Sequence, residues 1–153
     1  MKRSIRFYLL SVTLVAFING CSGMKSDKIS LGDEILADCP DRPNCVFSQA
    51  VDPAHAAEPF RFEKDPDEVW NGITSIVGTL PQTRIVKATD RYLHAECKSR
   101  LFGFIDDLEL QLNISTSVID IRSASRTGYY DFGVNRRRVS GLRQILMDSK
   151  LIQ

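Results

Sequence analysis

The chain has 153 residues, of which 43% are hydrophobic and 25% charged, and its formal net charge at pH 7 is +1. This length suits one domain with a modest core, and the sequence contains neither an internal repeat nor a low-complexity tract. The near-neutral charge lacks the signature of a nucleic-acid-binding protein, so we expect no nucleic-acid partner.

Residues 1–20 have the pattern of a secretory signal peptide. Lys2, Arg3 and Arg6 make a positive start, and the apolar run FYLLSVTLVAFI that follows is too short to predict a membrane span. The run ends before Cys21 in a way that resembles a bacterial lipobox, which predicts a lipid such as palmitate on that cysteine. An ordinary cleaved signal and an uncleaved anchor are the alternatives.

This signal predicts where the protein resides and how the chain is divided. Ser22, rather than an aspartate, follows the predicted lipidated cysteine, so we expect a periplasm-facing lipoprotein of the cell envelope, in the outer membrane. Loss of the signal removes three positive charges and changes the net charge from +1 to −2. Residues 21–34 predict a polar tether, and residues 35–153 a single α+β domain.

Three further cysteines follow the predicted lipidation site. An exported chain meets oxidising conditions, and the two prolines of CPDRPNC hold Cys39 and Cys45 near each other, so we expect these two to be bridged. We expect Cys97 to be a small buried thiol; a bridge to a loop cysteine, a reactive thiol and a three-cysteine metal site are the alternatives. Neither His55 nor His94 has ligand spacing to a cysteine, so the sequence predicts no metal site.

The first elements after the cysteine pair are a short strand and a helix. The stretch EPFRFE, residues 58–63, predicts the strand. In the helix that follows, Asp65 can cap the N-terminus, Pro66 suits the first turn and Pro81 ends the element. Its apolar stripe is expected to be core and comprises Val69, Trp70, Ile73, Ile76, Val77 and Leu80.

Four strands and a final helix complete the chain. The strands are predicted at 83–89, 91–99, 106–114 and 118–126, and the helix at 136–149. The alternation in the third of these strands predicts that four apolar residues face inward: Leu108, Leu110, Leu112 and Ile114. This order predicts an α+β fold, an antiparallel sheet of about five strands with two helices packed on one face and a more polar second face.

A search for chemistry-bearing motifs finds no G-x-S-x-G elbow, P-loop, dinucleotide fingerprint or H-E-x-x-H, and we expect no cofactor. On their strands His94 and Cys97 point to opposite faces, so they form no dyad. Asp106 and Asp107 also point oppositely, so they form no carboxylate pair. His55, in a loop rich in proline and alanine, is expected to be solvated.

One group of polar residues gathers where the strands meet the last helix. Antiparallel pairing is expected to bring the two aspartates near the end of the last strand. The candidate ligand-binding residues are Arg100, Asp106, Ser123, Ser125, Arg126, Tyr129, Asp131, Asn135, Arg136, Arg137 and Arg138. The group predicts either a structural network or an anionic-ligand site made of arginines, hydroxyls and exposed helix N–H groups. A catalytic site is the third alternative.

The run of three arginines is unusual because the positive end of a helix dipole disfavours cations in the first turn. Successive helix residues are about 100° apart, so the three side chains cannot share one partner. We expect Val139 to face the core and Arg136, three positions earlier, to lie nearest to it, beside Asp106 or Ser125. The other two arginines are expected to diverge toward the loop and solvent.

Three stretches, CPDRPNCVFSQA, RYLHAECKSRLFGFIDDLEL and IRSASRTGYYDFGVNRRRVSGLR, are similar to the DUF1499 family, a domain of unknown function. The similarity extends over about residues 36–147. The family occurs in bacterial envelope proteins and photosynthetic lineages and has no established activity, so the resemblance implies an exported setting and one complete domain but no catalytic roles. The residues that match its pattern are Cys39, Cys45, Arg100, Asp106, Asp107, Ser123, Ser125, Arg126, Tyr129, Asp131, Asn135 and the arginine run.

The sequence therefore predicts a non-catalytic envelope lipoprotein, held to the membrane by its N-terminal lipid. Its expected partner is an anionic small molecule, a lipid headgroup or an envelope protein. An envelope hydrolase that uses the serine, aspartate and arginine cluster is the alternative from another class, although no nucleophile–base pair has credible spacing. A purely structural envelope protein is the third hypothesis.

Overall fold

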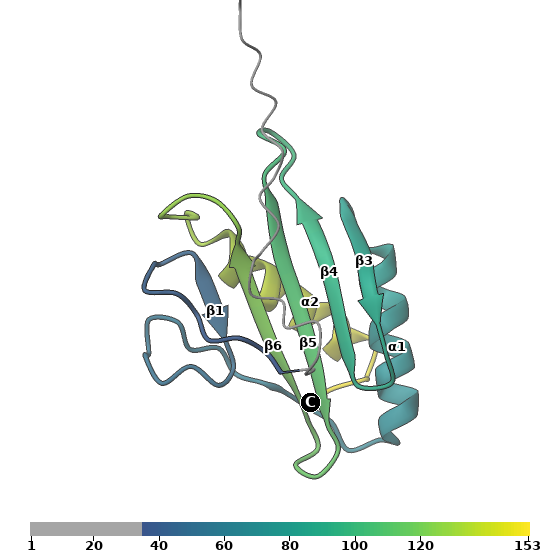
Figure 1. Ribbon diagram of the computed structural model, residues 1–153. Helices are drawn as coiled ribbons and strands as arrows, with labels where there is room; N and C mark the ends of the chain where they lie inside the picture. Colours follow the sequence, from purple (N-terminus) through teal and green to yellow (C-terminus); the bar gives the residue numbers. More distant parts are fainter. Residues whose placement is uncertain (1–34) are drawn as a thin grey trace, which may run out of the picture.

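Residues 35–153 are described by the computed structural model, in which a single β-sheet carries both helices on one face (Figure 1). The predicted signal peptide, Cys21 and the predicted tether lie outside the described residues. The elements in chain order are β1 (Cys45–Phe47), β2 (Phe60–Arg61), α1 (Pro66–Thr79), β3 (Thr83–Ala88), β4 (Tyr92–Lys98), β5 (Ile105–Asn113), β6 (Val118–Ser125) and α2 (Val134–Asp148).

The sheet is antiparallel throughout its named strands. Its order is β1-β6-β5-β4-β3, and the short β2 pairs with β6 as well. The three longest strands follow one another through short connections, so β5 pairs with β4 over Ile105–Gln111 and with β6 over Asp106–Asn113. This register places Asp106 opposite Ser125 and Asp107 opposite Ala124, as expected from the sequence.

The helices cover the face of the sheet that the alternating apolar residues predict. Asp65 caps α1 by accepting hydrogen bonds from the backbone N–H groups of Asp67 and Glu68, which explains why the helix begins there. α1 packs on β3, and α2 packs on β6 and β1. The core between helices and sheet includes Val69, Ile73, Val77, Leu93, Leu108, Leu110, Ile119, Ile121, Leu142 and Leu146.

The second face of the sheet is more polar, but part of it is covered. The segment 35–44 crosses in front of β6 in Figure 1, while α2 lies behind that strand. Leu36 from this segment packs with Phe47 and Tyr92 in a small second core. A disulfide joins Cys39 to Cys45 and so ties the segment to β1, as predicted.

The predicted α+β fold is confirmed, with three corrections. The sheet has six strands, where the sequence predicts about five. The additional strand is β1, whose three residues are too few to show a polar–apolar alternation. Ile114 lies in the turn after β5 and is partly exposed, so the inward set ends at Leu112. His55 is buried and its Nδ1 lies 2.9 Å from the Cys45 carbonyl oxygen, so it is not solvated.

Two further observations bear on the expected character of the chain. Cys97 is a free buried thiol whose pKa is raised by burial, and it accepts a hydrogen bond from Thr83. A buried, protonated thiol of this kind is inert, which agrees with the prediction that Cys97 is a small core residue.

Neither of the helices within residues 35–153 has the length and hydropathy of a membrane-spanning segment.

Candidate functional site

A polar cluster lies between the N-terminal half of α2 and the ends of β5 and β6. Arg138 donates to Asp106 at 2.6 Å and to the Ser123 hydroxyl at 2.9 Å. The Ser123 hydroxyl donates to the side-chain oxygen Oδ1 of Asn135 at 2.7 Å, and the side-chain NH₂ of Asn135 donates to the Ser125 hydroxyl at 3.0 Å. These five side chains satisfy one another inside an otherwise apolar layer, so the cluster acts as a structural network.

Asp131 supplies the cap that the arginine-rich start of α2 requires. Its carboxylate accepts hydrogen bonds from the backbone N–H groups of Gly133 and Asn135, each at 2.8 Å, and from the Asn135 side chain at 3.0 Å. A carboxylate at this position offsets the positive end of the helix dipole. It also occupies N–H groups that the anionic-ligand hypothesis assigned to a ligand.

The three arginines bind separate partners as predicted, but the predicted places of Arg136, beside Asp106 or Ser125, and of Arg138, toward the loop and solvent, are wrong. Arg138 is the one that reaches Asp106, whereas Arg136 is exposed and donates to the carbonyl oxygens of Ala54 and Ala56, both at 2.8 Å. Arg137 donates to the Phe132 carbonyl oxygen at 2.8 Å. All three guanidinium groups therefore already have partners within the fold.

The error came from locating the buried face of α2 by Val139 alone. The buried residues of the helix are Asn135, Val139, Leu142 and Leu146. At about 100° per residue, Arg138 lies only about 40° from Leu142, whereas Arg136 lies about 60° from Val139 on the other side. Leu142, which lies on the other side of Val139 from Arg136, moves the centre of the stripe toward Arg138, which then faces β5.

Arg126 belongs to a different network on the opposite face of the sheet. Its guanidinium donates to Asp107 at 2.7 Å and to Glu96 at 2.8 Å. His94 Nε2 lies 2.7 Å from the same Asp107 carboxylate, and Arg84 donates to Glu96 at 2.8 Å. A second buried pair, Glu109 with Arg122 at 2.6 Å, continues this network along the sheet face.

Ionisation follows from this arrangement. Burial opposes the charge on Asp107, but hydrogen bonds from His94 and Arg126 outweigh it, and the pKa of the carboxyl lies below its usual range. The hydrogen bond from Arg84 is the main reason that the pKa of Glu96 is also lowered. The pKa of Arg126 is raised, chiefly by its hydrogen bonds to Asp107. The network is thus ionised and internally neutralised at neutral pH.

An aromatic cleft of about 430 Å³ lies beside the polar cluster, and we call it the tip cleft. Its walls are the β4–β5 loop and the loop before α2, and its apolar lining residues are Leu101, Phe102, Phe104, Tyr130, Phe132 and Val134. The Phe102 and Phe104 rings stack at 5.6 Å, and the Tyr130 and Phe132 rings meet edge to face at 5.1 Å. Ring pairs of this geometry are favourable, and each wall of the cleft contains one.

Polar groups also line the tip cleft. Asp106, Ser125 and Asp131 belong to the polar cluster and are already hydrogen-bonded. Arg100 lines the same cleft and has no hydrogen-bond or ion-pair partner among residues 35–153. It is the one guanidinium of the predicted group that the fold leaves available for a ligand within the described part of the chain.

The structure thus separates the predicted site residues into four places. Arg100 lines the tip cleft, and Tyr129 is exposed in the loop that forms one of its walls. Arg126 lies on the opposite sheet face, and Arg136 and Arg137 bind backbone carbonyl groups. The residues that come together in the polar cluster are Asp106, Ser123, Ser125, Asp131, Asn135 and Arg138.

The hydrolase hypothesis finds no base for its serines among the described residues. The Ser123 hydroxyl donates to Asn135 and accepts from Arg138, and Ser125 accepts from Asn135. His55 and His94 are bonded elsewhere, to the Cys45 carbonyl group and to Asp107. An activated serine requires a base within hydrogen-bond reach.

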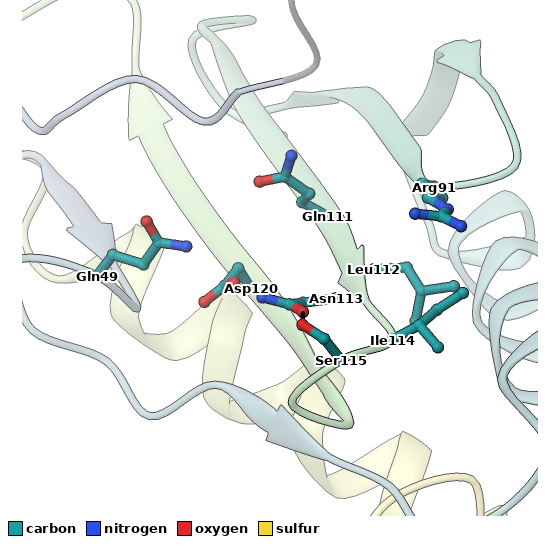
Figure 2. Close-up of a pocket in the computed structure, with 8 residues that line it drawn as sticks. All are labelled: Gln49, Arg91, Gln111, Leu112, Asn113, Ile114, Ser115 and Asp120. Atoms are coloured by element: carbon teal, nitrogen blue, oxygen red, sulfur yellow. Dashed lines mark hydrogen bonds between the residues drawn. The ribbon is translucent and has the colours of Figure 1, made fainter.

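A second, polar cleft of about 500 Å³ lies at the other end of β5 and β6 (Figure 2). Gln49 and Asn113 lie on either side of Asp120 in this view, and Arg91 lies beyond β5 from them. Ser115 donates to the Asn113 side chain at 2.7 Å. Sequence reasoning assigned no role to any of these residues.

Some of the features that sequence reasoning missed left a readable signal. The stretch LFGF places three large apolar residues in a turn between two strands, where polar residues are usual. That departure marks one wall of the tip cleft. The charge network around Asp107 left no such signal, because its members come from β4, β5 and the end of β6, far apart in sequence.

Comparison with known proteins gives one match. The family model described as "Protein of unknown function (DUF1499)" matches residues 35–146, which is most of the chain and nearly all of its described part. Searches of curated proteins and of solved structures give no significant match.

Proposed function

Because this chain belongs to the DUF1499 family, whose description assigns no activity, we propose its function from the site itself: it is a non-catalytic module that binds an amphiphilic anion of the lipid class in the tip cleft. The apolar part of the ligand lies between the two aromatic loops. Its anionic group lies at Arg100. This proposal keeps the expected anionic ligand but moves it from the arginine run to the cleft.

The observation that carries the proposal is the exposure of large apolar side chains on both loops. Leu101 is 82% exposed, Phe102 70% and Phe132 78%, and Phe104, Tyr129 and Tyr130 are each more than half exposed. Contiguous apolar surface of this kind marks a binding site, whereas scattered apolar residues do not. Burial of such surface contributes roughly 25 cal/mol per Å².

The backbone of one wall supports the same conclusion. Phe132 and Gly133 adopt positive φ angles of 55° and 74°. Glycine adopts this conformation freely, but for a bulky residue it is strained, and such strain clusters at ligand-binding positions. The conformation holds the Phe132 ring at the surface beside Tyr130 instead of in the core.

Electrostatics favour an anionic group on the ligand. The two carboxylates that line the cleft are compensated, Asp106 by Arg138 and Asp131 by three N–H groups. Arg100 is uncompensated and can donate to a phosphate in a two-pronged arrangement. The cleft therefore presents apolar walls with one available positive charge.

Vesicle flotation tests this function. The full chain carrying Cys21→Ser, which removes any lipid on that cysteine, should float with phosphatidylglycerol vesicles. The paired substitutions Leu101→Ser and Phe102→Ser should weaken this binding at least about tenfold, because each removes exposed apolar surface that the lipid buries. Arg100→Gln should weaken binding to phosphatidylglycerol vesicles and leave binding to phosphatidylcholine vesicles nearly unchanged.

Val51→Ser is the matched control, because Val51 is 98% exposed and lies outside the cleft lining. All variants change exposed side chains, so their thermal melting should match the parent chain. Equal flotation of the loop variant and the Val51 control would refute the proposal.

We also propose that the protein is a lipid-anchored envelope protein, held at Cys21 and facing the periplasm at the outer membrane. The basic start, the apolar run and the lipobox-like junction before Cys21 support this. Labelled palmitate should be incorporated into the wild-type chain and not into Cys21→Ala. Continued labelling of that variant would contradict the assignment.

A further inference from the structure

Asp120 differs from every other buried carboxylate in residues 35–153. Asp106, Asp107 and Glu109 each have an arginine within 2.7 Å. Asp120 is only 6% exposed, yet none of the ion pairs in the described part of the chain includes it. A buried carboxylate without a counter-charge is unfavourable unless hydrogen bonds replace its lost hydration.

The fold supplies Asp120 with one hydrogen bond. The Ser48 hydroxyl donates to its Oδ1 at 2.8 Å and accepts from the backbone N–H of Ile121 at 3.0 Å, which fixes the hydroxyl in place. The other carboxylate oxygen has no donor among the described residues. Asp120 lines the polar cleft of Figure 2, so a ligand there can supply one.

The other groups in this cleft restrict the ligand chemistry. The Gln49 amide can both donate and accept, and Arg91 offers donors from the far side of β5. Ile114 adds a partly exposed apolar surface at the turn. The lining therefore combines a carboxylate acceptor, the Gln49 amide, the Arg91 donors and an apolar patch within one opening.

Anions and divalent metal ions fit this lining poorly. An anion would meet the Asp120 carboxylate, and a divalent cation requires several oxygen ligands, whereas the described residues contain no group of three or more acidic, histidine or cysteine side chains that could hold a metal. A neutral molecule with several hydroxyl groups can bond to Asp120, the Gln49 amide and Arg91 at once, because each hydroxyl both donates and accepts.

We propose that the cleft around Asp120 binds a saccharide, with a sugar hydroxyl donating to the free oxygen of Asp120 and the carbon face of the ring on Ile114. The site lies at the opposite end of β5 and β6 from the tip cleft and shares no residue with it. Its success or failure is therefore independent of the proposed lipid function.

Saturation-transfer difference NMR of the full chain in detergent micelles tests the site, with maltotriose and triacetylchitotriose as probes. At least one trisaccharide should give saturable signals. Asp120→Asn should weaken its binding about tenfold or more, equivalent to about 1.4 kcal/mol, because the charge-assisted hydrogen bond becomes a neutral one. Arg91→Gln should also weaken it, and Asp148→Asn, an exposed substitution on α2, should not.

Thermal melting of Asp120→Asn separates a loss of sugar binding from a loss of folding. The binding result for this variant counts only if the variant melts near the wild-type temperature. If that variant is unstable, the exposed Arg91→Gln substitution alone decides the outcome. Absence of signal with both trisaccharides, or equal signals from wild type and Arg91→Gln, would overturn the proposal. Displacement of the sugar by free alanine would also overturn it, since a zwitterion would then be the ligand.

Discussion

The two faces of the sheet treat two consecutive aspartates differently. Asp106 faces the helices and pairs with Arg138 in a layer that is otherwise apolar. Asp107 faces the other way and joins His94, Arg126 and, through Arg126, Glu96. One carboxylate has a single charged partner and the other has two basic partners.

This difference predicts where the fold is fragile. On the helix face, loss of one guanidinium leaves a buried carboxylate without any counter-charge. On the second face, several groups share the charge, and the segment 35–44 ties down part of the same surface through its disulfide. Substitutions on the two faces should therefore differ: the stability of the helix-covered face depends on one ion pair, and that of the second face on several contacts.

The largest expected effect is that of Arg138→Ala. Removal of this guanidinium should lower the free energy of unfolding by about 3–5 kcal/mol. The reason is that Asp106 loses its counter-charge, and Ser123 and Asn135 lose a hydrogen-bond donor. Urea unfolding of the full chain measures it. Adding Asp106→Asn to Arg138→Ala should recover part of the loss, and a double variant less stable than Arg138→Ala alone would contradict the ion-pair account.

The next effect comes from the disulfide on the second face. Replacement of both Cys39 and Cys45 by serine should cost about 2 kcal/mol, the chain-entropy value for so short a loop. Wild-type protein in reductant should lose a similar amount, and the serine variant should be insensitive to reductant. If reductant destabilises the serine variant too, the stabilisation has another source.

The third effect appears only in acid. The pKa of the Asp107 carboxyl is lowered in the folded state, so between that value and about 4, the ordinary carboxyl pKa, the unfolded state binds more protons. The contribution of Asp107 to the free energy of unfolding should therefore be fully present above about pH 4 and should decrease as the pH drops through this window. Asp107→Asn should flatten this part of the profile, whereas Asp148→Asn should keep the wild-type slope.

The smallest effects are those of Arg136→Ala and Arg137→Ala. The exposed Arg136 guanidinium donates to two backbone carbonyl groups, so its loss should cost about 0.5–1.5 kcal/mol, well below the cost at Arg138. Arg137→Ala, which loses one exposed bond to the Phe132 carbonyl group, should stay within about 0.5 kcal/mol of wild type. A larger loss at Arg136 than at Arg138 would reverse the comparison of the two sides of α2.

Sequence alone determined the features that depend on neighbours along the chain. The cap at Asp65, the strands from 83 onward and the pairing of Cys39 with Cys45 follow from local spacing, and the structure confirms them. The opposite directions of Asp106 and Asp107 follow from the two-residue period of a strand. Short turns then bring Asp106 beside Ser125, since antiparallel neighbours pair end to end.

Only the tertiary structure decided which groups meet across elements. The choice of Arg138 over Arg136 depends on how α2 is rotated against the sheet, and the whole buried stripe of the helix sets that rotation, whereas Val139 alone does not. The Asp107 network, the tip cleft and the isolation of Asp120 each need side chains from distant segments. Local periodicity states which face a residue occupies, but the partner on that face depends on packing angles and strand order, which are set by the whole core at once.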